Sequence, residues 1–535
     1  MDTILINGTV ETMAGKAASA IAIKNGRIAY VGSDEEALKH KGDGTKVYDL
    51  SGRLALPGFT DTHIHTLHTG ESMNRLDLRG VKSVEEIIEK GKEYVLQKDL
   101  KPGEWIVAFG FNQNIFDDAK LPSKEGLDEI STQNPIICYR ICFHIAVVNS
   151  KAIEIAGISS DAKVSGGTLD LNENGELTGV LRENALELAH AAIPSMSIAD
   201  AEGILASATQ AMAESGITAV HSDDLSYISY EGLSEAVANA MARDELKVRI
   251  YEQCQCPSLS ALEGLAALGL NSGAGSERFS AVCVKILADG SLGASTAYML
   301  EPYSDDLSNT GIPIYEEGDL KELVKASHNA GFAVACHCIG DGALEMFLNA
   351  VEEAMCENPQ PIVHRVVHCQ VGNQQQYQRM ASLNMAADIQ PPFTATDSAI
   401  ANIRLGDART DDSYNWKSLL QHGVKLGGGS DSPVESFSPI WGIYCAVSRK
   451  NGAGGPSWLA GQCLSVYEAV SLYTVGAANI ANAAYTSGTL ETGKYADIVV
   501  LDTNIFQASE DGLRDAKPVM TIMGGSITYS NGDIA

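Results

Sequence analysis

Residues 54–68 read LALPGFTDTHIHTLH, an apolar run that ends in the motif His63-Ile64-His65. On an extended strand, side chains repeat their direction every two residues, so His63 and His65 are expected to face the same way. Two neutral imidazoles side by side can bind one zinc-like ion. The same spacing also fits two ordinary strand histidines, so the metal interpretation depends on further ligands elsewhere in the chain.

Apolar runs with β-strand character recur through the middle of the chain. They alternate with helix-like segments such as 199–216 and 320–331, which is the pattern of parallel strands joined by crossover helices. The sequence therefore predicts an α/β fold built on an eight-stranded, TIM-like (β/α)8 barrel. The expected strands lie at 54–63 and near residues 216, 246, 279, 331, 361, 384 and 423.

Both ends of the chain, 1–56 and 487–535, contain short alternating strands separated by glycine turns. Neither end can bury a core alone, so we expect one β-sandwich from both, with the barrel over 57–486. The interval 70–205 is too long for a crossover and predicts an inserted α+β subdomain. Insertions after a barrel strand lie at the catalytic face, which makes Arg140, His144 and Asn149 candidates for substrate contacts, although each could equally be structural.

The composition limits the partners of this 535-residue chain. Its formal net charge of -30 would repel phosphate backbones and anionic lipids, which argues against binding of nucleic acid or membranes. We find no secretory signal and no apolar run of transmembrane length, and the 11 scattered cysteines resemble buried thiols. A cytoplasmic enzyme with a small-molecule substrate is expected. A homodimer is expected by analogy with other large enzymes.

Further polar residues close several of the predicted barrel strands, where reactive groups of such barrels gather. They are Lys285 in CVKILADG, His337 in GFAVACHC, His368 in HRVVHC and Asp431 in GGGSDSP. A desolvated lysine amine can add carbon dioxide to form a carbamate, an anion able to bridge two metals. The alternative for Lys285 is an internal ion pair with Asp289 or another acid.

These residues carry a resemblance to the amidohydrolase superfamily of metal-dependent hydrolases, closest to its YtcJ-like, amidohydrolase family 3 branch. PGFTDTHIH, VKILADGSLGASTAYMLEPYSD, HCIGDGAL, HRVVHCQ, GSDSPV and SGTLETGKYADIVVLD all resemble that branch. The resemblance implies a metal site with a carboxylated lysine and an aspartate that also moves protons. The implied ligands are His63, His65, Lys285, His337, His368 and Asp431.

Such a cluster would hold one or two divalent ions, most commonly zinc, and activate water. The expected reaction is hydrolysis of a non-peptide carbon–nitrogen bond in an N-acyl or N-formyl amide, with Asp431 as catalytic proton carrier. D-aminoacylase-like or cyclic-amide hydrolysis, a metal-dependent lyase or isomerase, and a non-catalytic binding protein remain alternatives.

Substrate contacts are expected from residues near the same end of the barrel. His221 closes the second predicted strand and could bind substrate or support a ligand. Four aromatic residues in the loops after the seventh and eighth strands could bind an apolar substituent or simply belong to the core. They are Phe393, Trp416, Phe437 and Trp441.

Overall fold

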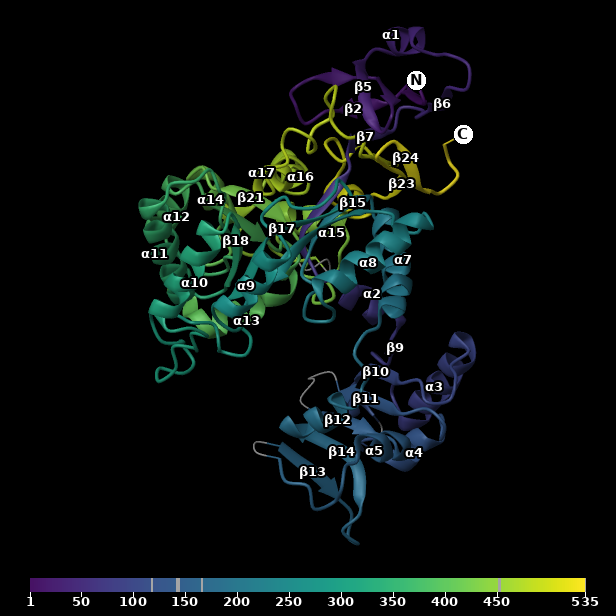
Figure 1. Ribbon diagram of the computed structural model, residues 1–535, viewed down its shortest axis with the longest axis vertical. Coiled ribbons are helices and arrows are strands. Elements are labelled where there is room, and N and C mark those ends of the chain that lie inside the picture. Colours follow the sequence, from purple (N-terminus) through teal and green to yellow (C-terminus); the bar gives the residue numbers. More distant parts are fainter. Residues whose placement is uncertain (117–118, 141–144, 165–166, 451–453, 535) are drawn as a thin grey trace. The chain divides into compact units, whose positions relative to one another are not determined.

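The computed structural model describes residues 1–116, 119–140, 145–164, 167–450 and 454–534 (Figure 1). The chain divides into two compact units. One unit contains Met1–Gly70 together with Ser197–Ala535, and the other contains Glu71–Met196.

Eight parallel strands form the nearly closed barrel of the larger unit, and the predicted eight-stranded barrel is confirmed. Each strand pairs with its neighbours in chain order. The side chains of β15 and β19 are buried throughout, as expected where helices cover a parallel sheet. The strands are β8 (Phe59–Ile64), β15 (Ile217–Ser222), β16 (Arg249–Gln255), β17 (Phe279–Leu287), β18 (Val334–Cys338), β19 (Arg365–His368), β20 (Ala386–Ile389) and β21 (Lys425–Gly428).

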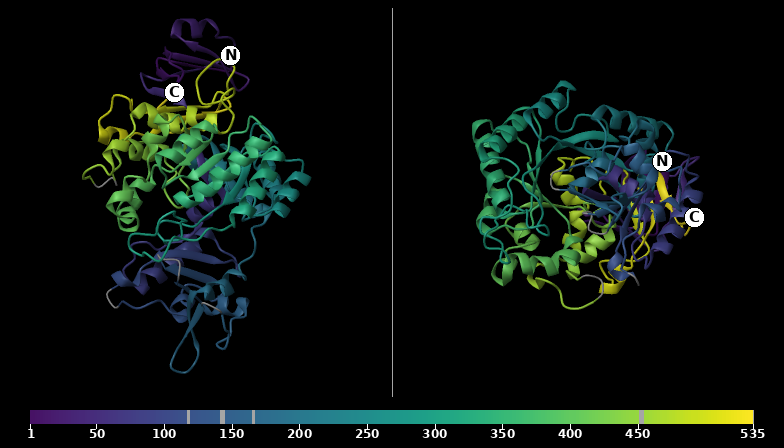
Figure 2. Two further views of the ribbon diagram at one scale, coloured as in Figure 1. Left: turned by 90° about the vertical axis from the view of Figure 1, so that its left-hand side faces the viewer. Right: turned by 90° about the horizontal axis from the view of Figure 1, so that it is seen from below.

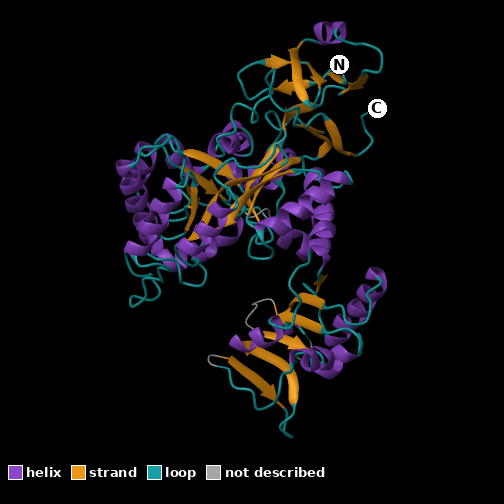
Figure 3. Cartoon of the chain, in the orientation of Figure 1, coloured by secondary structure: helices purple, strands orange, loops and turns teal. Residues whose placement is uncertain are grey.

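Helices form an outer ring around these strands (Figures 2 and 3). Helix α7 (Ile198–Glu214) begins with a capping box, in which the Ser197 and Asp200 side chains each accept a hydrogen bond from the other's backbone N–H. The other helices of the unit are α2 (Thr66–Asn74, which runs on past Gly70), α8 (Tyr230–Ala242), α9 (Leu259–Ala267), α10 (Glu317–Asn329), α11 (Asp341–Glu357), α12 (Gln374–Ser382), α13 (Phe393–Thr410), α14 (Trp416–Gln421), α15 (Pro439–Ser448), α16 (Val466–Leu472) and α17 (Val475–Ile480).

Strands from the two chain ends form two further sheets. Strand β7 pairs antiparallel with β22, with Leu54 opposite Leu501, so both ends share one sheet. The sheet orders are β5-β4-β1-β6 and β24-β23-β22-β7-β2-β3. The strands are β1 (Thr3–Ile6), β2 (Thr9–Glu11), β3 (Ala17–Ala18), β4 (Ala20–Lys24), β5 (Arg27–Gly32), β6 (Lys46–Asp49), β7 (Leu54–Pro57), β22 (Ile498–Leu501), β23 (Pro518–Met523) and β24 (Ser526–Ser530), with helices α1 (Asp34–Lys39) and α18 (Glu510–Arg514).

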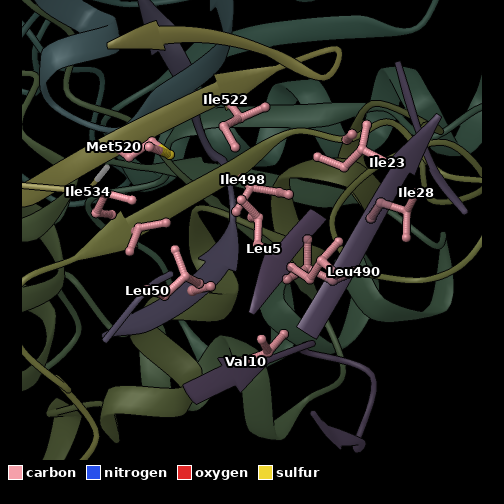
Figure 4. Close-up of a cluster of buried hydrophobic side chains, with 14 of the residues drawn as sticks. Leu5, Val10, Ile23, Ile28, Leu50, Leu490, Ile498, Met520, Ile522 and Ile534 are labelled. Carbon is pink, nitrogen blue, oxygen red and sulfur yellow. The ribbon is translucent and has the colours of Figure 1, made fainter. Parts of the chain in front are cut away.

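One apolar core joins these two sheets (Figure 4). Leu5 and Ile23 come from the first segment, whereas Ile498 and Ile522 come from the last, and all four are almost fully buried. Segments separated by more than 450 residues therefore stabilise one another, because neither contains enough apolar surface for a core of its own.

The unit over 71–196 contains a six-stranded sheet in the order β13-β14-β12-β11-β10-β9. Alternation along β11 sends Ile136 and Cys138 into one apolar cluster and Ile137 and Tyr139 into another, one on each face. Helix α7 is not part of this unit, although the expected insertion reached residue 205, because α7 packs on β15 and α8 of the barrel. The elements are β9 (Leu76–Asp77), β10 (Ile106–Phe111), β11 (Ile136–Arg140), β12 (Ile145–Val148), β13 (Gly167–Leu171), β14 (Leu177–Glu183), α3 (Val84–Lys98), α4 (Lys124–Asp128), α5 (Ser150–Ala156) and α6 (Glu187–His190).

The described residues contain neither a membrane-spanning helix nor a disulfide bond. Within those ranges, no helix combines the length and the apolar character needed to cross a bilayer. The cysteines in the described part of the chain are all free thiols, and most of them are buried.

Candidate metal centre

The ends of the first and last barrel strands bring two histidines and one aspartate together. The Asp431 backbone N–H donates to the His63 carbonyl over 2.8 Å. Asp431 Oδ1 lies 3.4 Å from His63 Nε2 and 3.2 Å from His65 Nε2. Each of the three residues offers one ligand atom, and these three atoms all lie within 4.8 Å of one another. This spacing fits a single metal ion.

Glycine makes this close approach possible. A Cβ atom at Gly429 would lie 2.7 Å from the His63 backbone nitrogen and 3.0 Å from its carbonyl oxygen. The glycine-rich run before Asp431 therefore lets the chain after β21 lie directly against β8, and Asp431 reaches the two histidines as a result.

Lys285 enters the same group from β17. Its Nζ lies 3.3 Å from His63 Nε2 and 3.3 Å from Asp223 Oδ2, and both charged side chains are buried. Asp223 was not among the expected site residues. The one signal for it was its place just after β15, in VHSDD. The expected alternative for Lys285, an ion pair with Asp289 or another acid, is present with Asp223. The Asp289 carboxylate instead accepts hydrogen bonds from the backbone N–H groups of Tyr298, Ile339 and Gly340.

His337 and His368 complete the group. Their ring centroids lie 4.5 Å apart, and the His368 ring is 5.5 Å from that of His63. The structure thus brings all six implied ligands to the end of the barrel where its strands finish. His368 has a left-handed φ of 75°, which turns the chain at the end of β19.

The protonation states of this group suit a divalent cation. Burial lowers the pKa of His63 and His368, and it lowers the pKa of His337 to about 4. Burial alone would raise the pKa of Asp431, but hydrogen bonds with His63 and His65 hold it well below its usual range. Neutral imidazoles beside an ionised carboxylate are the donors that zinc and similar ions bind.

His65 is the exception among the histidines. Burial lowers its pKa, but the hydrogen bond to Asp431 outweighs that effect and raises the pKa to about 9. In the absence of a metal ion, protonated His65 is therefore the positive group that pairs with Asp431. Metal binding at such a site releases that proton, because the ligand nitrogen must be free.

His221 has partners of its own. Its Nδ1 accepts a 2.9 Å hydrogen bond from the Arg365 guanidinium, and its ring contacts that of Tyr251. The residue closes β15 as expected, but the side chain is held in the barrel interior by Arg365. The structure offers no support for direct substrate contact by His221.

The insertion candidates have roles within their own unit. Arg140 donates from Nε to Gln113 Oε1 over 2.8 Å. The buried Asn149 side chain caps α5 by accepting from the Ala152 N–H, and it donates to the carbonyls of Ser131 and Asn134. These bonds account for Asn149 as a structural residue. His144 lies outside the described residues.

Among the aromatic candidates, Phe393 alone is seen against a site residue. Its ring stacks on that of His368, with centroids 6.1 Å apart and planes inclined by 10°. Trp416 is 1% exposed and belongs to the core. Trp441 lines a hollow with Glu214, which ends α7 before β15, and with Pro518, which begins β23 of the sheet formed by the chain ends, so it lies near the start of β15 rather than beside Asp431. Phe437 is half-buried.

Comparison with known proteins gives consistent matches. The model of the amidohydrolase family matches residues 46–529. The putative amidohydrolase YtcJ of Bacillus subtilis is 34% identical over 99% of both chains, and the N-substituted formamide deformylase of Arthrobacter pascens is 24% identical over 99% of this chain and 98% of its own. The crystal structure of an uncharacterized metal-dependent hydrolase from Pyrococcus furiosus is 31% identical, covers 94% of this chain and 100% of its own, and superposes with a TM-score of 0.80.

Proposed function

This chain belongs to the amidohydrolase family, and from that premise we propose that it hydrolyses a non-peptide carbon–nitrogen bond in an N-acyl or N-formyl amide. The observation that carries the proposal is the geometry of the Asp431 carboxylate, which lies 3.2 Å from His65 Nε2 and 3.4 Å from His63 Nε2 beside the buried Lys285. The amide class is supported by the deformylase name of one relative, which shares 24% identity over nearly the whole chain.

The donor set fits a divalent metal, with zinc as the proposed ion. His63, His65 and Asp431 would hold it, and His337 and His368, whose rings neighbour each other and that of His63, are the proposed further ligands. A divalent ion in this place supplies a Lewis acid and lowers the pKa of water towards neutrality.

The proton chemistry falls to Asp431. Because its pKa is held well below the usual range, the carboxylate is ionised at neutral pH and can accept the proton of the attacking water. The same group then returns that proton to the leaving nitrogen as the carbon–nitrogen bond breaks. No covalent acyl intermediate with the protein is required.

Lys285 is proposed to carry a carbamate. Its amine nitrogen would attack carbon dioxide and lose one proton, which gives an anion next to His63, 3.3 Å away. The support is position, because Lys285 is buried among the proposed metal donors, with its Nζ 3.3 Å from His63 Nε2 and 3.3 Å from Asp223 Oδ2. Carbon-13 NMR after exchange with labelled bicarbonate tests this modification directly.

A substrate screen tests the activity. Zinc-replete protein is incubated with N-formyl amines, N-acyl amines, N-acyl amino acids of both hands and cyclic amides, and released amine is quantified by mass spectrometry. We expect turnover of formyl or acyl amides, with one oxygen from labelled water in the acid product. Cleavage without label would indicate a lyase, and protein that binds no metal would overturn the proposal.

Two further properties are proposed on general grounds. The strongly acidic composition and the small-molecule chemistry of the family favour a cytoplasmic enzyme. A homodimer is tested by gel filtration with light scattering.

A further inference from the structure

Each histidine of the candidate metal centre donates one ring N–H to an oxygen of the protein. His63 Nδ1 lies 2.9 Å from Gln253 Oε1, and His368 Nδ1 lies 2.7 Å from Gln390 Oε1. Backbone carbonyls serve the other two: Asp223 accepts from His65 Nδ1, and Gly290 accepts from His337 Nε2. A neutral imidazole carries one proton, so the nitrogen that donates leaves the lone pair on the other nitrogen.

The two glutamine side chains cannot be turned over, because both ends of each amide are engaged. Gln253 Nε2 donates to the Thr62 carbonyl over 2.9 Å, and Gln390 Nε2 donates to the Asp388 carbonyl over 3.1 Å. A flipped amide would place its oxygen against a carbonyl oxygen, which has no proton to give. The backbone carbonyls of Thr62 and Asp388 therefore orient the two glutamine amides, and each amide in turn orients the imidazole that it bonds.

Burial makes this arrangement strict. Gln253 is 0% exposed and Gln390 is 2% exposed, so solvent offers no substitute partner for either amide. Leaving a buried donor or acceptor unmet is unfavourable, so one tautomer is favoured over the other.

We propose that Gln253 and Gln390 are positioning residues that set His63 and His368 in the Nδ1–H tautomer before metal arrives. Their Nε2 lone pairs then point into the group that contains Lys285 and Asp431. This inference rests on the proposed function in requiring a metal site, but it concerns the metal-free protein. It also explains why two polar side chains without charge are buried beside the site.

The choice of an amide has an electrostatic reason. A carboxylate in the place of Gln253 would also accept the Nδ1 proton, but it would add a negative charge near Asp431 and Asp223 and make the imidazole a stronger base. An amide orients the ring without that charge. Loss of such a supporting bond typically weakens metal affinity by about 10–100-fold.

The test compares four variants with the wild-type protein, all metal-free at the start. Gln253→Met and Gln390→Met keep the side-chain length but remove the oxygen that accepts the Nδ1 proton. Gln253→Glu keeps an accepting oxygen for His63 but loses the amide N–H that donates to Thr62. Gln376→Met is the matched control, since Gln376 is also a buried glutamine but serves the start of α12. Histidine labelled with nitrogen-15 reports the tautomer of each ring, assigned by histidine substitution, and zinc titration against a chelator gives affinity.

We expect the wild-type protein, Gln253→Glu and Gln376→Met to show His63 as the Nδ1–H tautomer. Gln253→Met should show mixed tautomers at His63 only, Gln390→Met at His368 only, each with about 10–100-fold weaker zinc binding. Unchanged tautomers and affinity in both methionine variants would overturn the inference. Equal losses in Gln376→Met would do so too, because they would indicate general destabilisation. Absence of zinc binding by wild-type protein would instead overturn the proposed function, and the tautomer spectra would still test the orientation.

Discussion

Two buried histidines outside the metal centre form a chain of hydrogen bonds that leaves no place for an extra proton. The Val334 N–H donates to His364 Nδ1 over 3.1 Å. His364 Nε2 lies 3.0 Å from His328 Nδ1, and His328 Nε2 lies 2.7 Å from the Asn358 carbonyl. Because the first group only donates and the last only accepts, both rings are satisfied when neutral. A further proton would break one of these bonds.

The cost of that proton follows from the pKa of His364. Burial lowers the pKa from 6.5 to about 3 in the folded protein. Between pH 6.5 and pH 3, the unfolded chain therefore binds a proton at His364 that the folded chain does not bind. The contribution of His364 to the free energy of unfolding is fully present above pH 6.5 and is lost as the pH decreases towards 3. Between pH 8.0 and pH 5.5 this one group removes about 1.4 kcal/mol of folding free energy.

His364→Asn tests this reasoning. The asparagine oxygen can still accept from the Val334 N–H, but the variant has no titrating ring and leaves His328 Nδ1 without its donor. At pH 8.0 we expect the variant to be about 1–3 kcal/mol less stable than wild type by urea denaturation. At pH 5.5 that deficit should shrink by about 1.4 kcal/mol, because only the wild type pays for the excluded proton.

An exposed histidine provides the control. His40→Asn removes a histidine ring that lies at the surface, and it controls for the replacement of an imidazole by an amide as such. A deficit of His364→Asn that is the same at both pH values would refute the account of the buried pair. So would a deficit that grows as the pH falls.

Three other changes test the site and its support. Asp431→Asn should reduce amide turnover by about 10²–10⁴-fold and lower the zinc content measured by mass spectrometry, whereas unaltered turnover would exclude Asp431 as the proton carrier. Lys285→Ala should abolish turnover, with partial recovery when short carboxylic acids and bicarbonate are added, and full activity without them would remove the carbamate from the proposal. Arg249→Met leaves Asp497 buried without the guanidinium that lies 2.9 Å away, so the urea midpoint should fall by an amount equivalent to about 3–5 kcal/mol, and an unchanged midpoint would show that this ion pair does not stabilise the fold.

Much of the barrel and the metal centre could be predicted from sequence. Eight buried runs between helix-like segments indicated eight parallel strands, because period and burial follow directly from the backbone geometry. The centre was predicted because polar residues at the ends of such strands must converge at one end of a barrel. His63, Lys285 and Asp431 could therefore be grouped although more than 360 residues of chain separate the first from the last.

The partners of individual side chains could not be predicted in this way. Lys285 lies next to Asp223 rather than Asp289, because Asp289 is already engaged by three backbone N–H groups from the loops after β17 and β18. Trp441 follows the last barrel strand in sequence, yet it lies in the first turn of α15 and lines a hollow with Glu214 and Pro518, away from Asp431. These outcomes depend on loop paths that no local pattern encodes.

The amino-acid sequence by itself determined the strand count, the union of the two chain ends and the kinds of donor atom at the site, because periodicity, turn residues and side-chain chemistry are local properties. Only the tertiary structure decided which nitrogen of His63, His337 and His368 carries the proton of the neutral ring. That choice belongs to Gln253, Gln390 and the Gly290 carbonyl, which come from other strands and loops than the histidines they bond. Hydrogen bonds between such distant groups exist only once the barrel has closed around them.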